Sequence, residues 1–367
     1  MLRTISIKLL VSIDTDAALK SVQRAFSEAC NNIVPFAKAH RVFNNVKLHH
    51  LCYYDIRSKS PLGSQFVCNA IKSVAGKYKA LKLKKQAEVP LIHFKPKSVH
   101  YDKKTYTLLD ENTVSLTILS GRVKAKLVWG KHQRAVFDKG LAKEAELIIK
   151  NGSWYFNLVI DIPNPETVQS DVVMGVDLGE NNIAATSTGK LFGGGKLRYD
   201  RDRFLAMRRR LQRNGSQSAK QLLKRLSGKE ARHVTQVNHV VANAIIDEAI
   251  KHNVGVIALE DLTHIRKRIK AGKRMRARLH RWAWYQLQLF IAYKAEAVGI
   301  KLEYVNPAYS SQTCHQCGAI AKRDKNRLTC TCGNRAHSDL NASLNLAWLG
   351  KTAVLPRGAV NRPNVAA

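Results

Sequence analysis

Residues 172–189 read VVMGVDLGENNIAATSTG, the stretch of the chain that decides its fold. The apolar run before Asp177 predicts a buried strand, and residues 183–187 predict a second strand after a polar turn. Further strands are expected at 193–199, 254–259 and 302–305, and helices at 203–252, 280–298 and 339–349. Because strands alternate with helices, the chain from residue 172 onwards is predicted to be an α/β domain.

Two later stretches also place an acidic residue at the end of an element. VGVIALED at 254–261 predicts a strand that ends at Glu260, and AHSDLNASLNLA at 336–347 predicts a helix that begins at Asp339. Strand ends are where open α/β sheets hold their sites, so these carboxylates and Asp177 are expected to meet. Three carboxylates repel one another, and two Mg²⁺ or Mn²⁺ ions would offset that repulsion and clamp both oxygens of a phosphoryl displacement.

The order strand–strand–strand–helix–strand, with acids on the first and fourth strands, is that of the ribonuclease H-type nuclease fold. Each acid alone has a simpler explanation, as a loop residue, a strand end or a helix N-cap, so only their coincidence favours catalysis. Asp261 and Asp324 are not assigned to the site, and Asp261 would point away from Glu260 if the strand continues.

A cluster of cysteines predicts a structural zinc site. Its members are Cys314, Cys317, Cys330 and Cys332, a C-x-x-C followed by a shorter C-x-C. Four thiolates at this spacing suit tetrahedral zinc, but the short second pair leaves the fourth ligand open between Cys332 and His337. His315, between two ligands, is expected to be exposed. A redox-active pair is the alternative, but it lacks a strand–C-x-x-C–helix context.

The charge of the chain indicates a nucleic-acid partner. The 367 residues include 61 Lys and Arg against 27 Asp and Glu, giving a net charge of +34 and a pI of about 10.1. With 45% hydrophobic residues and 9 prolines, the chain is not a disordered basic tail. It has no apolar run of about 18 residues, so we expect no transmembrane span, and its N-terminus does not resemble a signal peptide.

Two basic stretches, 198–232 and 264–281, each carry a net charge of +9 and flank the proposed carboxylates. Helix-borne Arg and Lys suit contacts with phosphates. Within or beside them, Trp282 and Trp284 are expected to lie in the core rather than to stack on bases. The nucleic-acid candidates are Arg208, Arg209, Arg210, Lys224, Arg225, Arg266, Lys267, Arg268, Lys273, Arg274, Arg276 and Arg278.

The N-terminal part predicts a small antiparallel barrel with inserted helices. Its elements are a strand at 1–11, helices at 14–42 and 46–58, a third helix starting with Ser60 and Pro61, and strands at 106–109, 113–119, 125–129, 145–149 and 154–160. In the third helix Phe66, Ala70, Val74 and Tyr78 form an apolar stripe. Gln65, Asn69 and Lys72 lie off that stripe and are weak candidates for contacting a partner. The polar segment 163–171 is expected to be a linker.

The motifs together resemble the TnpB (OrfB) family of insertion-sequence proteins, which is related to the type V CRISPR effectors. The resemblance rests on GVDLG at 175–179, IALEDL at 257–262, residues 281–318 and SDLNASLNLA at 338–347, and more loosely on LGSQFVCNAIKSVAGKYK at 62–79. The family's usual second C-x-x-C is a C-x-C here, and His337 stands where the family often has an acid or another polar residue.

This resemblance implies an RNA-guided DNA endonuclease of multidomain α+β architecture. It implies a wedge barrel at 1–12 and 88–165, a helical recognition region at 13–87, a ribonuclease H-like (RuvC) nuclease domain at 172–310 and 335–350, a zinc-binding insertion at 311–334 and a flexible tail at 351–367. Asp177, Glu260 and Asp339 match the catalytic carboxylates, which would hold two Mg²⁺, and the cysteine cluster would hold one structural Zn²⁺. The expected partners are a guide RNA derived from the transposon end and double-stranded target DNA, cut beside a short flanking motif.

We expect a monomeric ribonucleoprotein in the cytoplasm of a prokaryote, associated with the nucleoid and not with a membrane. Two other functions remain open. A non-cleaving RNA-guided regulator would be expected to have lost carboxylates that this chain retains, and a transposase acting without RNA would not copurify with a discrete RNA species.

Overall fold

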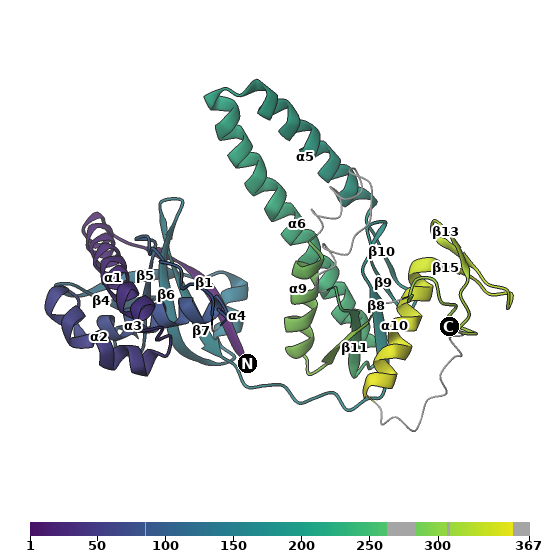
Figure 1. Ribbon diagram of the computed structural model, residues 1–367, viewed down its shortest axis with the longest axis horizontal. Helices are drawn as coiled ribbons and strands as arrows, with labels where there is room; N and C mark the ends of the chain where they lie inside the picture. The colour runs from purple at the N-terminus through teal and green to yellow at the C-terminus, as the bar shows by residue number, and fades with distance from the viewer. Residues whose placement is uncertain (85, 263–282, 307–308, 355–367) are drawn as a thin grey trace. The chain divides into compact units, whose positions relative to one another are not determined.

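The computed structural model of the protein describes residues 1–84, 86–262, 283–306 and 309–354 (Figure 1). The chain divides into two compact units, the first comprising Met1–Pro163 and the second beginning at Asn164. Its α+β composition agrees with the predicted class. Among the helices of the described ranges, none combines the length and the apolar composition needed to cross a bilayer.

The first unit contains one antiparallel sheet of seven strands in the order β2-β6-β7-β1-β5-β4-β3. The strands are β1 (Leu2–Leu10), β2 (Ser98–Tyr101), β3 (Tyr106–Leu108), β4 (Thr113–Ile118), β5 (Gly121–Val128), β6 (Leu141–Lys150) and β7 (Ser153–Asp161). The expectation that the N-terminal strand joins the sheet is confirmed, since β1 pairs with both β5 and β7. The four-residue β2 and the short helix α4 (Lys131–Phe137) were not predicted.

The two ends of this sheet approach each other and nearly close it into a barrel. Tyr101 of β2 and Tyr106 of β3 come from opposite edges, yet both rings pack edge-on against Phe156 of β7. The Tyr101 hydroxyl donates to the carbonyl oxygen of Thr117 beside the far edge, and the Tyr106 hydroxyl donates to the carbonyl oxygen of Lys143. The predicted barrel is therefore confirmed as a near-closed one.

Three helices are inserted between β1 and β2: α1 (Ile13–Ala39), α2 (Asn45–Lys59) and α3 (Ser64–Ala80). The predicted stripe of α3 is confirmed, because Phe66, Ala70, Val74 and Tyr78 are all buried. The predicted start of this helix at Ser60 and Pro61 is wrong. Ser60 is extended and ends α2, as the residue before a proline favours, and α3 begins after Gly63.

The second unit contains a mixed sheet in the order β10-β9-β8-β11-β12. The strands are β8 (Val173–Asp177), β9 (Asn182–Thr186), β10 (Leu191–Gly193), β11 (Val256–Glu260) and β12 (Lys301–Val305). β8, β11 and β12 run parallel, whereas β9 is antiparallel to β8 and β10 is antiparallel to β9. The strand predicted at 193–199 is wrong beyond Gly193, since a helix starts at Gly195 and buries Leu197 and Phe204 on one face.

The helices of this unit are α5 (Gly195–Asn214), α6 (Gln217–Lys251), α9 (Trp284–Glu296) and α10 (Ser338–Val354). Figure 1 shows α5 and α6 as a long hairpin that projects from the sheet. The turn between them forms because Gly215 adopts a left-handed conformation with φ of 68° and Ser216 caps α6 by accepting from the Ala219 N–H. The basic helical region predicted from 203 to 252 is thus two helices.

The segment expected to be a linker has no helix or strand, but it lies along the second unit. Val168 N–H donates to the carbonyl oxygen of Gly299, and the Ser170 hydroxyl donates to that of Asn253. At the other end, α10 continues to Val354, so the tail expected from residue 351 begins within a helix, and residues 355–367 lie outside the described residues.

Candidate functional site

Strand geometry brings two of the predicted acidic residues together. Leu259 of β11 packs into the apolar core with α6 and α9, whereas Ala258 packs with α10. Because successive side chains alternate between the two faces of a strand, Glu260 shares the α10 face with Ala258. Leu259 pairs with Val176 in the parallel register, so Glu260 lies next to Asp177 at the carboxyl ends of β11 and β8.

The third acidic residue arrives on the helix that covers this face. A Cβ atom at Gly175 would lie 2.0 Å from the carbonyl oxygen of Ser343 and 2.4 Å from the amide nitrogen of Ala347, so glycine allows the α10 backbone to lie directly on β8. Gly175 and Asp177 are two residues apart and face the same side of the strand. The first turn of α10 therefore places Asp339 beside Asp177.

Asp177, Glu260 and Asp339 line one cavity of about 370 Å³, which Arg198 and Arg323 also line. Asn182 Nδ2 donates to Asp339 Oδ2 at 2.9 Å, and the Arg323 guanidinium lies 3.6 Å from Asp339 Oδ1. Among the described residues, Asp261 and Asp324 are not part of this lining, as expected. The cavity thus gathers the three predicted carboxylates.

The carboxylates of this cavity are electrostatically strained. Burial raises the pKa of Asp177 well above its usual range, and the negative charges of Glu260 and Asp339 raise it further. Burial also raises the pKa of Glu260, although hydrogen bonds with Asp177 and Ser310 oppose this rise. The neighbouring arginines therefore do not fully compensate the negative charge of the three carboxylates.

A divalent cation fits this cavity by its donor chemistry. Asp177, Glu260 and Asp339 offer carboxylate oxygens to the cavity, and such ligands are preferred by Mg²⁺ and Mn²⁺ over softer metals. A bound cation would also remove the repulsion that raises the pKa of Asp177. Asp177, Glu260 and Asp339 are the residues that would hold it.

The four cysteines meet at a second site. The Sγ atoms of Cys314, Cys317, Cys330 and Cys332 all lie within 4.8 Å of one another, as tetrahedral ligation of one zinc ion requires. Around them stand β13 (Lys322–Asp324), β14 (Arg327–Thr329) and β15 (Arg335–His337), a sheet of three short strands. The cluster supports the predicted structural zinc and contains Cys332, despite the short C-x-C spacing.

The surroundings of the thiols also suit a cation. Burial raises the pKa of Cys314, but hydrogen bonds from Asn334 and from backbone amides lower it to about 6. The Ala319 backbone lowers the pKa of Cys317, yet the adjacent thiols outweigh it and raise the value to about 12. Ligands that hinder one another's ionisation in this way are relieved by a bound metal.

The two histidines near the cluster have other partners. His337 Nδ1 accepts from the backbone N–H of Asp339, so this residue contacts the start of α10. His315 was expected to be exposed and is instead half-buried, with its Nδ1 3.0 Å from Asn341 Oδ1. This contact joins the cysteine cluster to α10.

The basic candidates lie on the helical hairpin as far as the structure describes them. Arg209, Arg210, Lys224 and Arg225 are exposed on α5 and α6, whereas Arg208 is half-buried and forms an ion pair with Glu230. The second basic group, Arg266, Lys267, Arg268, Lys273, Arg274, Arg276 and Arg278, lies outside the described residues, as does Trp282. Trp284 is buried, as predicted for the core.

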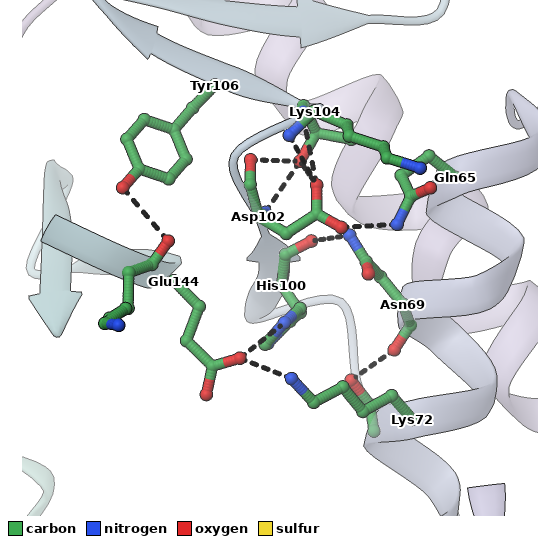
Figure 2. A network of polar contacts seen from close by, with 11 residues as sticks. Gln65, Asn69, Lys72, His100, Asp102, Lys104, Tyr106 and Glu144 are labelled. Carbon is green, nitrogen blue, oxygen red and sulfur yellow. Dashed lines mark hydrogen bonds and ion pairs between the residues drawn. The ribbon is translucent and has the colours of Figure 1, made fainter.

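The three off-stripe residues of α3 are engaged within the first unit (Figure 2). Asn69 was a weak candidate for contacting a partner, but it is only 3% exposed and donates to the carbonyl oxygen of His100. Gln65 donates to Asp102, and Lys72 pairs with Glu144. The helix turns these side chains towards β2 and β6 because the stripe and its neighbours pack together against the barrel.

Sequence reasoning missed two asparagines of α10, Asn341 and Asn345, that hold the loop before the cysteines. It also missed the polar residues that contact the carboxylates from distant parts of the chain, namely Asn182, Ser310 and Arg323. The one available signal was the i, i+4 spacing of Asn341 and Asn345 in SDLNASLNLA, which puts two amides on one face of the helix.

Comparison with known families matches residues 157–266 to OrfB_IS605, described as "Probable transposase", and residues 284–346 to the "Cas12f1-like, TNB domain". The chain is 32% identical over 223 residues to the "TnpB-like protein MJ0751" of Methanocaldococcus jannaschii, an alignment that covers 56% of this chain and 78% of that protein. It is also 32% identical over 221 residues to the "CRISPR-associated endodeoxyribonuclease Cas12f1" of Sulfoacidibacillus thermotolerans, covering 54% of this chain and half of that relative.

Among solved structures, the fold is similar to that in the "Cryo-EM structure of the Cas12f1-sgRNA-target DNA complex". The TM-score is 0.62 at 17% sequence identity, and the match covers 92% of this chain and 83% of that chain. At this identity the likeness concerns the fold alone. On the sequence relatives and the matched families, the chain belongs to the TnpB (OrfB) family, which is related to the Cas12f type V effectors.

Proposed function

We propose that the protein is an RNA-guided DNA endonuclease that hydrolyses phosphodiester bonds of target DNA next to a short flanking motif. The observation that carries this proposal is the convergence of Asp177, Glu260 and Asp339 on one cavity. Support comes from the sheet order, in which Asp177 and Glu260 end adjacent parallel strands, an arrangement typical of ribonuclease H-type (RuvC) nucleases. Relatives named as CRISPR-associated endodeoxyribonucleases add to it.

The three carboxylates would hold two Mg²⁺ ions, which supply charge stabilisation and an acidified water when bound. The chain's own residues then have separate tasks. Asp177 and Glu260 present adjacent carboxylates to the cavity, and Asn182 fixes the orientation of Asp339 through its 2.9 Å hydrogen bond. In the hydrolysis a water oxygen bonds to phosphorus, the bond from phosphorus to one bridging oxygen breaks, and that oxygen gains a proton.

Arg323 lines the cavity from β13, close to Asp339, where its guanidinium can donate hydrogen bonds to a phosphate oxygen. Arg198, on α5, lines the same cavity and donates to Asn181 Oδ1 at 2.9 Å. These two cations would counter the charge of the DNA backbone beside a negatively charged site.

In this proposal the barrel and the inserted helices of the first unit are the wedge and recognition regions that bind a guide RNA from the transposon end and read the flanking motif. The exposed cations of α5 and α6 would contact phosphates of the nucleic acids. Specificity would come from base pairing between the guide and the target strand. The partners are therefore one structured RNA and a DNA duplex.

The test is cleavage of a plasmid carrying a matching target by the protein purified with its RNA. With Mg²⁺ the wild type should cut, and Asp177→Ala should cut more than about 100-fold more slowly, because even outer-shell partners of metal ligands are worth about 10–100-fold. Equal cleavage by Asp177→Ala would refute the assigned site. If the protein purifies with RNA but fails to cut, the result would indicate the non-cleaving regulator. If no discrete RNA copurifies with it, the result would indicate the transposase that acts without RNA.

A further inference from the structure

Two asparagine side chains on α10 fasten the loop that leads into the cysteine cluster. Asn341 Nδ2 donates to the carbonyl oxygen of Thr313 at 2.7 Å. Asn345 Nδ2 donates to the carbonyl oxygens of Ser310 at 2.8 Å and of Thr313 at 2.7 Å. Asn341 is completely buried. A buried side-chain amide that donates hydrogen bonds to loop carbonyl oxygens fixes the position of the loop. Breaking these bonds would leave buried polar groups unpaired, which is costly.

The oxygen of Asn341 contacts the cysteine cluster itself. Its Oδ1 accepts from the backbone N–H of His315 at 3.0 Å. His315 follows Cys314 directly, and Asn334 Nδ2 donates to Cys314 Sγ at 3.2 Å while lying 3.3 Å from the His315 ring. One end of the fastened loop is therefore fixed to the proposed zinc ligands.

The other end of the loop reaches a carboxylate. The Ser310 hydroxyl, on a residue only 5% exposed, lies 3.4 Å from Glu260 Oε1 and donates to it. The carbonyl oxygen of the same residue is held by Asn345. Asp339 lies on the helix that carries both asparagines. The position of α10 thus bears on Asp339 directly and on Glu260 through the loop.

We propose that Asn345, Asn341 and Ser310 are positioning residues that couple zinc binding at the cysteines to divalent-cation binding at the carboxylates. The coupling rests on the proposed function, since it takes the carboxylates to be a cation site. Residues that orient metal ligands are typically worth about 10–100-fold in metal affinity. Because coupling between two sites is reciprocal, each metal strengthens the binding of the other by the same factor.

The decisive experiment measures Mn²⁺ binding to the full-length, zinc-loaded protein by electron paramagnetic resonance of the free ion. Ser310→Ala and Asn345→Leu should raise the Mn²⁺ dissociation constant about 10-fold while the zinc content stays that of the wild type. Ser310→Thr, which keeps the hydroxyl, should restore most of the affinity. At saturating Mn²⁺ the cleavage rate of the variants should return towards that of the wild type, which a general loss of folded protein would not allow.

The matched control is Asn243→Leu. Asn243 is an exposed residue of α6, and its Oδ1 accepts a hydrogen bond from Lys294 and none from the loop residues discussed above. This variant should leave the Mn²⁺ affinity unchanged. If Ser310→Ala and Asn345→Leu also leave it unchanged, the inference is refuted. Asp177→Ala separates this from a failure of the proposed function, because a carboxylate site requires that variant to lose Mn²⁺ affinity whatever Asn345 does.

Reciprocity supplies a readout that involves no catalysis. Saturating Mn²⁺ should lower the apparent dissociation constant for zinc in the wild type, measured by competition with a chelator, by the factor found for Mn²⁺. In Asn345→Leu this effect should shrink several-fold. Zinc affinity in the wild type that does not respond to Mn²⁺ would overturn the coupling.

Discussion

In the first unit Asp102 and Glu144 lie against donors, whereas in the second unit Asp177, Glu260 and Asp339 lie against one another. Figure 2 shows that Asp102 accepts hydrogen bonds from Gln65 and from backbone amides, and that Glu144 lies between Lys72 and His100. These contacts give Asp102 neutral hydrogen-bond donors and give Glu144 the Lys72 ammonium as an ion-pair partner. The second cluster has Arg323 at 3.6 Å and otherwise hydroxyl and amide partners. The difference is that the three acids of the second cluster repel one another, and in the proposed function a bound cation would compensate that repulsion.

The largest expected effect comes from removing the charge of one acid in the cluster of Asp177, Glu260 and Asp339. Asp177→Asn should lower cleavage more than about 100-fold. Without divalent cations it should nevertheless stabilise the protein by at least about 1 kcal/mol, the repulsion of two like charges about 4 Å apart in bulk water, because burial weakens the screening. This corresponds to a rise of roughly 2–4 °C in the melting temperature of a domain of about 150–250 residues. Calorimetry with and without Mg²⁺ measures it, and a destabilised metal-free variant would contradict the interpretation.

The matched change in the first unit should have the opposite sign. Asp102→Ala removes the acceptor of Gln65 and of the Lys104 backbone N–H, whereas the N–H and the hydroxyl of Thr105 keep the backbone carbonyl oxygen of residue 102 as a partner. The loss of the half-buried hydrogen bond from Gln65 should cost about 1 kcal/mol. Urea unfolding of the full chain should show this loss both with and without Mg²⁺. A stability that depends on Mg²⁺ would mean that Asp102 also belongs to a cation site.

The two clusters should also respond oppositely to pH. Burial lowers the pKa of His100 below 6.5, although Glu144 opposes this, so the unfolded chain takes up its proton first and stability is lost as the pH falls below about 6.5. The raised pKa of Asp177 acts in reverse, because the metal-free folded state binds the proton more tightly and stability falls as the pH rises above the ordinary value of 3.8. The measurement is the free energy of unfolding of His100→Gln and of Asp177→Asn at several pH values. His100→Gln should remove the loss of stability at low pH, and Asp177→Asn should remove the loss as the pH rises. A pH dependence that persists in the variant would refute the assignment to that residue.

The smallest expected effect concerns the hairpin, where Arg208, paired with Glu230, is followed by the exposed Arg209 and Arg210. Arg209→Gln and Arg210→Gln should each reduce the slope of log affinity for RNA against log salt by about 1, because each exposed arginine releases a counterion. Arg208→Gln is the control, since its guanidinium is already paired with Glu230. Filter binding at several salt concentrations measures the slopes. Equal slopes for all three variants would show that exposure does not identify the phosphate contacts.

The carboxylates were predictable from sequence because each stands at the end of an apolar element, and a strand's alternation decides which face its last side chain takes. The cysteines were predictable from spacing alone. Ser60 was misassigned because its extended backbone ends one helix before a proline and resembles a cap of the next. Asn69 and Arg323 could not be placed, because His100 and Asp339, their partners, come from elements whose packing no local pattern specifies.

The contact at Gly175 also sets an order of events during synthesis. The strand that bears Asp177 is made early in the second unit, yet the helix that must lie on it carries Asp339, and Asn182 and its partner Asp339 are 157 residues apart. The three carboxylates can meet only after the ribosome has released α10. A nascent chain can thus fold its barrel, and in the proposed function engage its RNA, while it is still unable to cut DNA.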